Sequence, residues 1–247
     1  MDKNKYNYYL DAHCHYDLLY SDYLMETFKE NALKAITCSV DMNSYLRLEE
    51  IRKKNIKNIY FAYGLYPDYV LNRKLEETLK DLEKIDFSRA LAIGEIGLDY
   101  KITKDKNKRL EQKQLLERQL EIAQSLKKPV ILHTRYATKP TLEILKNYSK
   151  LKVLLHWFTG QEEEKLEALK RGYYLTQKAL NKNTIDVNKY KNQILLETDY
   201  PIYLNGEKTT PLSIIEVYKQ YCREYDLNLE DVKKTMHNNF EKLFLKV

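Results

Sequence analysis

The chain alternates eight short runs of β-branched, aliphatic and aromatic residues with longer charged segments that carry apolar residues at helical spacing. Such alternation is typical of repeated βα units, whose parallel strands can close into a barrel. A length of 247 residues is usual for one barrel of eight units. Since no linker rich in proline, glycine or serine interrupts the pattern, we expect one domain over residues 1–247. The predicted fold class is α/β, a single (β/α)8 TIM barrel.

The clearest expected helix covers residues 108–127, where Leu116, Leu120 and Ala123 fall on one face and Pro129 follows its end. Further helices are expected at about residues 75–85, 140–148, 163–170 and 211–225. The expected strands cover residues 8–12, 35–40, 59–63, 90–94, 130–132, 153–155, 173–176 and 194–197.

Composition narrows the class of protein. No apolar stretch reaches the roughly 20 residues of a membrane span, and the polar first residues lack the apolar core of a signal peptide. We therefore expect a cytoplasmic protein without membrane contact, and a monomer by default. Cys14, Cys38 and Cys222 are widely spaced, which predicts free thiols. The net charge of +6, from 42 basic and 36 acidic residues, permits a polyanionic partner without requiring one.

Six side chains of the kinds that bind metal ions each lie at or just after the end of an expected strand. In α/β barrels the loops that follow the strands converge on the catalytic site. Imidazoles and carboxylates at that face are ligands of divalent cations, so the set predicts a two-metal hydrolase site. His237 follows no expected strand, and we do not expect it to be a ligand. The six candidates are His13, His15, Glu95, His133, His156 and Asp199.

The first strand and the fourth strand supply the first candidates. Asp11, His13 and His15 are spaced by two, so their side chains are expected to face the barrel lumen, where two imidazoles can bind one cation. Asp11 is expected beside them as an auxiliary ligand or as the hydrogen-bond partner of a ligating imidazole. Glu95 lies in an apolar strand, where a carboxylate needs a cation, and a position between two ions would satisfy both of its oxygens.

Later strands complete the set. His133 and His156 close two similar strands in consecutive units and offer imidazoles for a second cation. Asp199 is expected to complete the first metal site and to accept a proton from water activated by the ion pair. Arg135 has the planar fork that suits phosphate oxygens, or it closes the barrel mouth by pairing with a carboxylate. Glu197 is a weaker candidate, which either faces away or accepts a hydrogen bond.

Five short motifs follow one another along the chain: Asp-Ala-His-Cys-His, Gly-Glu-Ile-Gly-Leu-Asp, Pro-Val-Ile-Leu-His-Thr-Arg, His-Trp-Phe-Thr-Gly and Glu-Thr-Asp-Tyr-Pro. In order and spacing they resemble the TatD-type metal-dependent deoxyribonucleases of the amidohydrolase superfamily. The resemblance implies cleavage of DNA phosphodiester bonds, in the 3′ to 5′ direction, with two divalent metal ions as cofactors. It places one ion at His13, His15, Glu95 and Asp199, and the other at Glu95, His133 and His156. Histidine-rich ligand sets suit zinc or manganese better than magnesium.

The chain departs from the family pattern at two positions. Tyr66, in Gly-Leu-Tyr-Pro, stands where the family usually has histidine. Its phenol can donate a hydrogen bond to a phosphate oxygen, but it is bulkier than an imidazole and a poor acid at neutral pH. Trp157 replaces a small residue, and it either stacks on a base or packs beneath the loop.

Two other functions remain open at this point. An ester or amide hydrolase, such as an aminoacyl-tRNA deacylase, would use the same metals, and Tyr66 favours that alternative. A barrel that binds metal or nucleic acid without catalysis is disfavoured, because all six ligand types are present. The basic residues of segment 101–109, which follow Glu95, either guide a nucleic-acid backbone or begin a solvated helix.

Overall fold

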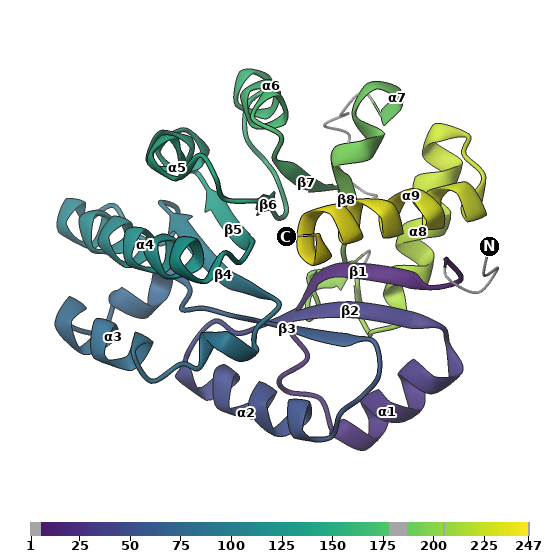
Figure 1. Ribbon diagram of the computed structural model, residues 1–247, viewed down its shortest axis with the longest axis horizontal. Helices are drawn as coiled ribbons and strands as arrows, with labels where there is room; N and C mark the ends of the chain where they lie inside the picture. The colour runs from purple at the N-terminus through teal and green to yellow at the C-terminus, as the bar shows by residue number, and fades with distance from the viewer. Residues whose placement is uncertain (1–5, 178–186, 205, 247) are drawn as a thin grey trace.

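Eight parallel strands form one sheet, in the order β1 to β8, and helices cover its outside (Figure 1). The computed structural model describes residues 6–177, 187–204 and 206–246. The first five residues, where we expect no signal peptide, lie outside this part of the chain. The predicted TIM-barrel fold is confirmed. The strands are β1 (Tyr9–Cys14), β2 (Leu33–Cys38), β3 (Ile59–Tyr63), β4 (Ala92–Asp99), β5 (Val130–Arg135), β6 (Val153–Leu155), β7 (Tyr174–Gln177) and β8 (Ile194–Leu196).

The barrel closes between its last strand and its first. Just past β8, the backbone N–H of Asp199 donates to the carbonyl of His13 at 3.0 Å. The N–H of His15 donates to the carbonyl of Tyr200 at 2.7 Å. These two bonds join the segments that carry His13, His15 and Asp199, so the closure of the barrel also brings three candidate site residues together.

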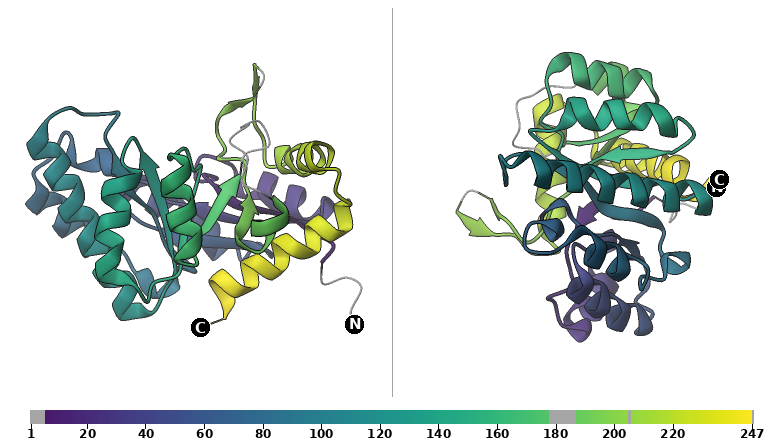
Figure 2. Two further views of the ribbon diagram at one scale, coloured as in Figure 1. Left: turned by 90° about the horizontal axis from the view of Figure 1, so that it is seen from above. Right: turned by 90° about the vertical axis from the view of Figure 1, so that its left-hand side faces the viewer.

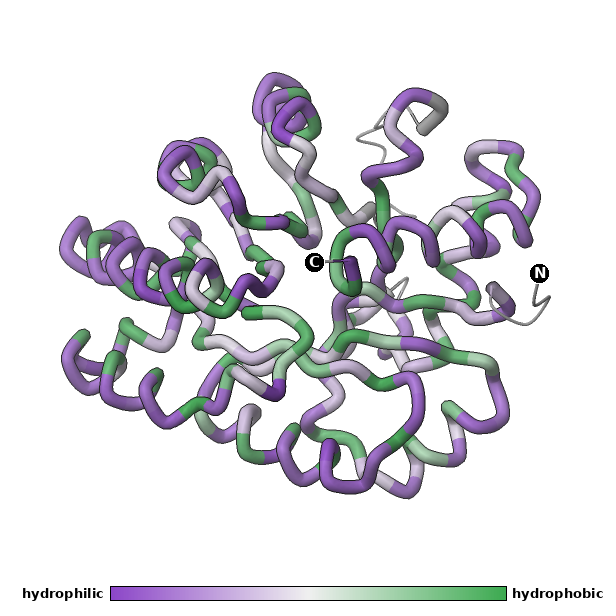
Figure 3. Tube along the Cα trace, viewed as in Figure 1, coloured by the Kyte–Doolittle hydropathy of each residue, from purple (hydrophilic) through white to green (hydrophobic). Residues whose placement is uncertain are grey.

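The outer helices bury one face against the strands and expose the other. Hydrophilic colours dominate these helices in Figure 3, whereas hydrophobic residues are frequent along the strands. In α4 the buried stripe includes Leu116, Leu120 and Ala123, and the side chain of Asp105 caps the first turn. The main helices are α1 (Ser21–Glu30), α2 (Met42–Lys53), α3 (Leu75–Leu82), α4 (Lys106–Leu126), α5 (Thr138–Leu145), α6 (Glu162–Lys170), α7 (Val187–Tyr190), α8 (Ser213–Tyr225) and α9 (Leu229–Phe240).

Several elements differ from the sequence-based expectation. β4 and β5 run further than expected, to Asp99 and Arg135, because their residues remain buried or half-buried beyond the apolar core of each run. Glu95 therefore lies inside β4, and His133 lies inside β5, rather than at the strand ends. β1 also runs past its expected end, to Cys14, so His13 lies inside this strand rather than after it. The helices α1, α2, α7 and α9 were not among the expected ones. In α2 the buried face includes the polar residues Ser44 and Glu49, which obscure its periodicity.

A short hairpin projects from the barrel after β8. Its strands are β9 (Tyr203–Leu204) and β10 (Glu207–Lys208), and they pair in antiparallel fashion. The hairpin stands clear of the barrel body in both views of Figure 2. Among the described residues, no helix has the length and apolar character needed to cross a membrane.

Candidate metal centre

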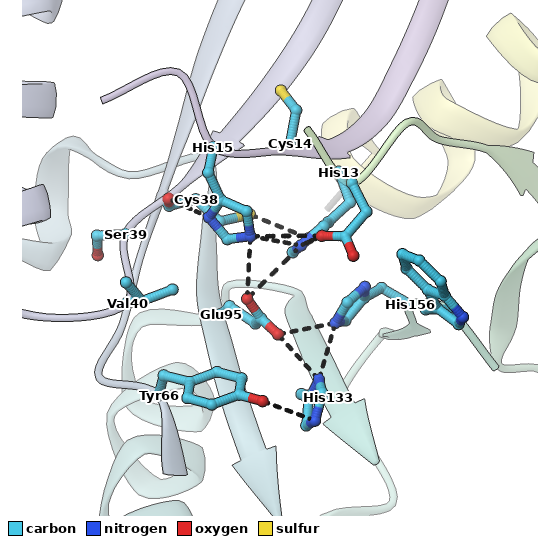
Figure 4. A network of polar contacts seen from close by, with 12 residues as sticks. His13, Cys14, His15, Cys38, Ser39, Val40, Tyr66, Glu95, His133 and His156 are labelled. Carbon is cyan, nitrogen blue, oxygen red and sulfur yellow. Dashed lines mark hydrogen bonds and ion pairs between the residues drawn. The ribbon is translucent and has the colours of Figure 1, made fainter. Parts of the chain in front are cut away.

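The six candidate ligands lie together at the carboxyl end of the barrel. Five of them line one pocket, and the sixth, His13, is fully buried and contacts His15 and Asp199 of that pocket. Glu95 occupies the middle of the group, with His13 and His15 on one side and His133 and His156 on the other (Figure 4). The pocket is lined by His15, Val40, Tyr66, Asp68, Glu95, His133, Thr134, Arg135, His156, Trp157, Thr159, Asp199 and Ile202.

Four donor atoms lie close together on the first side of Glu95. Nε2 of His13 and Nε2 of His15 lie 3.2 Å apart. Each lies close to Oδ1 of Asp199, at 3.3 and 3.5 Å respectively. Oε2 of Glu95 completes the set, 3.6 Å from His13 and 3.3 Å from His15. Ligands about 2.1 Å from one tetrahedral metal ion lie roughly 3.4 Å from one another, and these five distances are close to that value.

The second side uses the other oxygen of Glu95. Oε1 lies 2.8 Å from Nε2 of His156 and 3.1 Å from Nδ1 of His133. The two imidazole nitrogens are 3.3 Å apart. The rings of His13 and His156 stack between the two sides, with centroids 3.8 Å apart. Two groups here, His13–His15–Asp199 and His13–Glu95–His156, have ligand atoms close enough to hold a metal ion. Glu95 therefore lies where a carboxylate could bridge two ions.

The charges of the site favour a cation. Burial alone would raise the pKa of Glu95, but His156, His133 and His15 hold it well below its usual range. Burial would likewise lower the pKa of His15, but its hydrogen bonds with Asp199 and Glu95 raise that pKa to about 10. Burial lowers the pKa of His13, which favours the neutral imidazole that a metal requires. Asp199 and Glu95, whose negative charges keep His15 protonated, would also attract a divalent cation to the space between these three side chains.

The outward nitrogens of His13, His15 and His156 face groups on neighbouring segments of the barrel. Nδ1 of His15 donates to the carbonyl of Cys38 at 3.0 Å, and Nδ1 of His13 lies 3.3 Å from the Cys38 thiol. Nδ1 of His156 lies 3.8 Å from Oε2 of Glu197, and both atoms are buried without a hydrogen-bond partner. Oε1 of Glu197 accepts a hydrogen bond from the backbone N–H of Trp157 at 2.8 Å, which is one of its two expected roles.

Asp11 does not hold an imidazole ring as expected. Its carboxylate accepts from the backbone N–H of Thr198 at 3.0 Å and from the Thr198 hydroxyl at 2.6 Å. It also accepts from the backbone N–H of His13 at 3.3 Å. The register of β1 against β2 shifts between Asp11 and Cys14, which breaks the simple two-residue alternation. Asp11 therefore fastens β1 to the segment after β8.

Sequence analysis missed Asp99, a fully buried carboxylate at the end of β4. Its Oδ2 accepts from Arg135, with Nε at 2.8 Å, and from the Tyr66 hydroxyl at 2.9 Å. Nε2 of His133 lies 3.2 Å from the same oxygen. The signal was present in the motif that contains Glu95, because Asp99 lies four residues further along the same apolar strand. Arg135 closes the barrel mouth by this ion pair, yet its side chain is 42% exposed and still lines the pocket.

The remaining expectations have mixed outcomes. Trp157 and Tyr66 both line the pocket. His237 lies away from it, with Nε2 3.2 Å from the carbonyl of Tyr8. In the basic segment, α4 begins at Lys106, which is one of its two expected roles, and the Lys108 ammonium donates to the carbonyls of Val70 and Arg73. The thiols Cys14, Cys38 and Cys222 are free, as expected.

Comparison with known proteins supports one family. A profile described as TatD related DNase matches residues 10–245. An uncharacterized metal-dependent hydrolase of Buchnera aphidicola is 28% identical, over 95% of this chain and 98% of its own length. Human deoxyribonuclease TATDN3 is 27% identical, over 96% of this chain and 95% of its own length.

Solved structures share the fold. The TatD homologue YjjV of Escherichia coli superposes with a TM-score of 0.79 at 23% identity, covering 98% of this chain and all of that one. A TatD-family hydrolase of Entamoeba histolytica gives 0.76 at 20% identity, covering 96% and 98%. The profile match, the barrel and the donor groups around Glu95 agree, and the chain belongs to the TatD-related DNase family, a family of metal-dependent hydrolases in the amidohydrolase superfamily.

Proposed function

We propose that this protein hydrolyses phosphodiester bonds in DNA, from the 3′ end, with two divalent cations bridged by Glu95. The observation that carries the proposal is the division of the Glu95 carboxylate, whose two oxygens face two separate sets of donor atoms. Relatives described as deoxyribonucleases support DNA as the substrate. The imidazole-rich donor set favours zinc or manganese over magnesium.

In this proposal the ligands divide between the two ions. His13, His15 and Asp199 would hold the first ion, His133 and His156 would hold the second, and Glu95 would be shared between them. When bound, the ions supply the Lewis acidity that lowers the pKa of water and offsets the charge of the phosphate.

Three side chains of the pocket act on the reactants. Asp199, whose side chain is 18% exposed at the pocket, accepts the proton of the attacking water. Arg135 uses Nε and one terminal nitrogen on Asp99, and its exposed edge is available to the nonbridging phosphate oxygens. Trp157, which follows His156 and lines the pocket, offers a ring face on which a base can stack.

The test uses metal-stripped protein and end-labelled DNA, single-stranded and duplex, with magnesium, manganese or zinc added separately. Asp199→Asn is compared with Asp226→Asn, because both residues have left-handed backbone, with φ of 49° and 50°, and asparagine tolerates that conformation. We expect metal-dependent laddering from the 3′ end by the wild type and by Asp226→Asn, and little by Asp199→Asn. Normal turnover by Asp199→Asn would exclude its role as the proton acceptor. Intact DNA in every tube, with metal bound, would exclude DNA as the substrate.

A second candidate function is hydrolysis of an ester or amide, such as an aminoacyl ester of tRNA. Asp68 favours it, because this carboxylate lines the same pocket and would repel a phosphate but attract an amino group. Aminoacyl esters belong in the substrate panel for this reason. Release of free amino acid in preference to nucleotides would support the second candidate over the first.

A further inference from the structure

Tyr66 lies at the one position where this chain replaces a family histidine with a phenol, and its contacts differ from those of a substrate-binding group. The Tyr66 hydroxyl lies 2.9 Å from Oδ2 of Asp99 and 2.9 Å from Nε2 of His133. The Tyr66 and His133 rings meet edge to face, with centroids 4.7 Å apart. Figure 4 shows the phenol directed at the His133 ring from the side away from Glu95.

The two nitrogens of His133 have different surroundings. Nδ1 faces Oε1 of Glu95 and Nε2 of His156, where the second group of donors converges. Nε2 faces the opposite way, toward Asp99 and Tyr66. A metal ion on Nδ1 leaves the imidazole proton on Nε2, since a neutral ring carries a proton on one nitrogen only. Among the described residues, the Tyr66 and Asp99 oxygens are placed to accept that proton.

The hydrogens of this cluster can then be counted. Asp99 is an acceptor only, and the single hydroxyl hydrogen of Tyr66 is donated to it. The Tyr66 oxygen accepts the Nε2 hydrogen of His133. In this arrangement the phenol has no hydrogen left for a phosphate oxygen, although donation to phosphate was the role expected from its sequence.

Several hydrogen bonds fix Asp99 in the position from which it contacts Tyr66 and His133. Its backbone N–H and carbonyl are both hydrogen-bonded to the side-chain amide of Gln112 on α4, at 3.0 and 3.2 Å. Its Oδ1 accepts from the backbone N–H of Lys101 at 3.0 Å. Arg135 offsets the buried negative charge. A carboxylate held in this way can orient a neighbouring imidazole.

We infer that Tyr66, together with Asp99, is a positioning residue that holds His133 in the tautomer presenting Nδ1 to the second metal ion. The inference rests on the proposed function only in requiring that second ion. It does not depend on the substrate. Loss of such an outer hydrogen bond typically weakens metal binding by about 10-fold to 100-fold.

The experiment is calorimetric titration of metal-stripped protein with Mn²⁺, for wild type, Tyr66→Phe and Asp99→Asn. Tyr66→Phe keeps the ring and removes only the hydroxyl. The matched control is Tyr69→Phe, which also removes a hydrogen bond from a tyrosine to an aspartate, Tyr69 to Asp81 at 2.8 Å, outside the site. We expect Tyr66→Phe to weaken one of two Mn²⁺ affinities about 10-fold to 100-fold and to leave the other unchanged. Tyr69→Phe should bind both ions as wild type does.

Asp99→Asn should weaken the same ion at least as much as Tyr66→Phe, because the amide is a weaker acceptor for the Tyr66 hydroxyl hydrogen, and that hydrogen bond turns the phenol oxygen toward His133. Circular dichroism checks the fold of each variant before titration. If Tyr66→Phe binds both ions with wild-type affinity and instead raises the KM for substrate, the phenol contacts substrate and the inference is overturned. If the wild-type protein binds two ions but cleaves no DNA, the proposed substrate is wrong. The Tyr66→Phe titration then still shows whether Tyr66 positions His133 for the second ion.

Discussion

Gly97 is the residue at which a single methyl group should disturb the metal centre most directly. It lies in β4 with φ of +145° and pairs with His133 of β5. A Cβ at this position would lie 2.0 Å from the carbonyl oxygen of His133, where ordinary Cβ contacts are 3.4 Å or longer. Both atoms belong to backbone in the barrel wall, so a rotamer change cannot relieve the clash.

The expected cost of Gly97→Ala has two parts. Overpacking of a dense interior costs about 1–3 kcal/mol, and a strained backbone conformation adds about 1–3 kcal/mol. The free energy of unfolding should therefore fall by roughly 2–6 kcal/mol in total. Relief of the clash requires β5 to move by about 1 Å, which displaces His133, and a misplacement of that size can lower turnover about 100-fold.

The matched control is Gly172→Ala. Gly172 also has positive φ, +82°, but no atom lies within 4 Å of a Cβ built there. This control should lose only the conformational part, about 1–2 kcal/mol. Urea denaturation of metal-stripped protein, followed by circular dichroism, measures both variants, and calorimetry measures their affinity for Mn²⁺. If Gly97→Ala is no less stable than Gly172→Ala and binds two ions normally, the inference that β4 approaches the His133 backbone too closely for a side chain is wrong.

Three further predictions concern charge. Glu95→Gln should lose both ions, because an amide offers one neutral oxygen in place of two charged ones. Elemental analysis of the purified protein measures the bound metal, and two retained ions would contradict this prediction. Metal binding at pH 7.5 should release protons and tighten as the pH rises toward 9, because the metal-free protein raises the pKa of His15 to about 10 and a ligating imidazole must be neutral. Titrations in buffers of different ionisation enthalpy count these protons, and a pH-independent affinity would contradict the reasoning. Arg52, Tyr63 and Arg89 lower the pKa of Glu49 from 4.5 to about 2, although burial opposes them, so its stabilising effect should be complete above pH 4.5 and lost as the pH falls toward 2. Glu49→Gln should make the free energy of unfolding depend less on pH in this range, as measured by urea denaturation between pH 2.5 and 5. An unchanged pH dependence in this variant would contradict the prediction.

The fold was predictable because the signal is repeated. Each βα unit carries its own apolar strand and amphipathic helix, so errors of a few residues at the ends of single strands do not alter the barrel. The six candidate ligands were found for a related reason, since parallel strands direct their carboxyl ends to one face. Helix α2 was missed because buried Ser44 and Glu49 interrupt its apolar stripe.

The contacts around the ligands could not be read from the sequence. Asp11 was expected to hold an imidazole, but the register shift in β1 turns it toward Thr198. Asp99 was overlooked because β4 was expected to end near Gly94, which would have placed Asp99 in a loop. Hydrogen bonds of this kind depend on the relative register of separate strands, and periodicity along one strand carries no information about that register.

The most direct test of the two-ion centre is an anomalous difference map from crystals grown with Mn²⁺. The account predicts two peaks about 3.5–4 Å apart, with one oxygen of Glu95 beside each. His13, His15 and Asp199 should surround one peak, and His133 and His156 the other. A single peak, or a pair of peaks without Glu95 between them, would contradict the central claim.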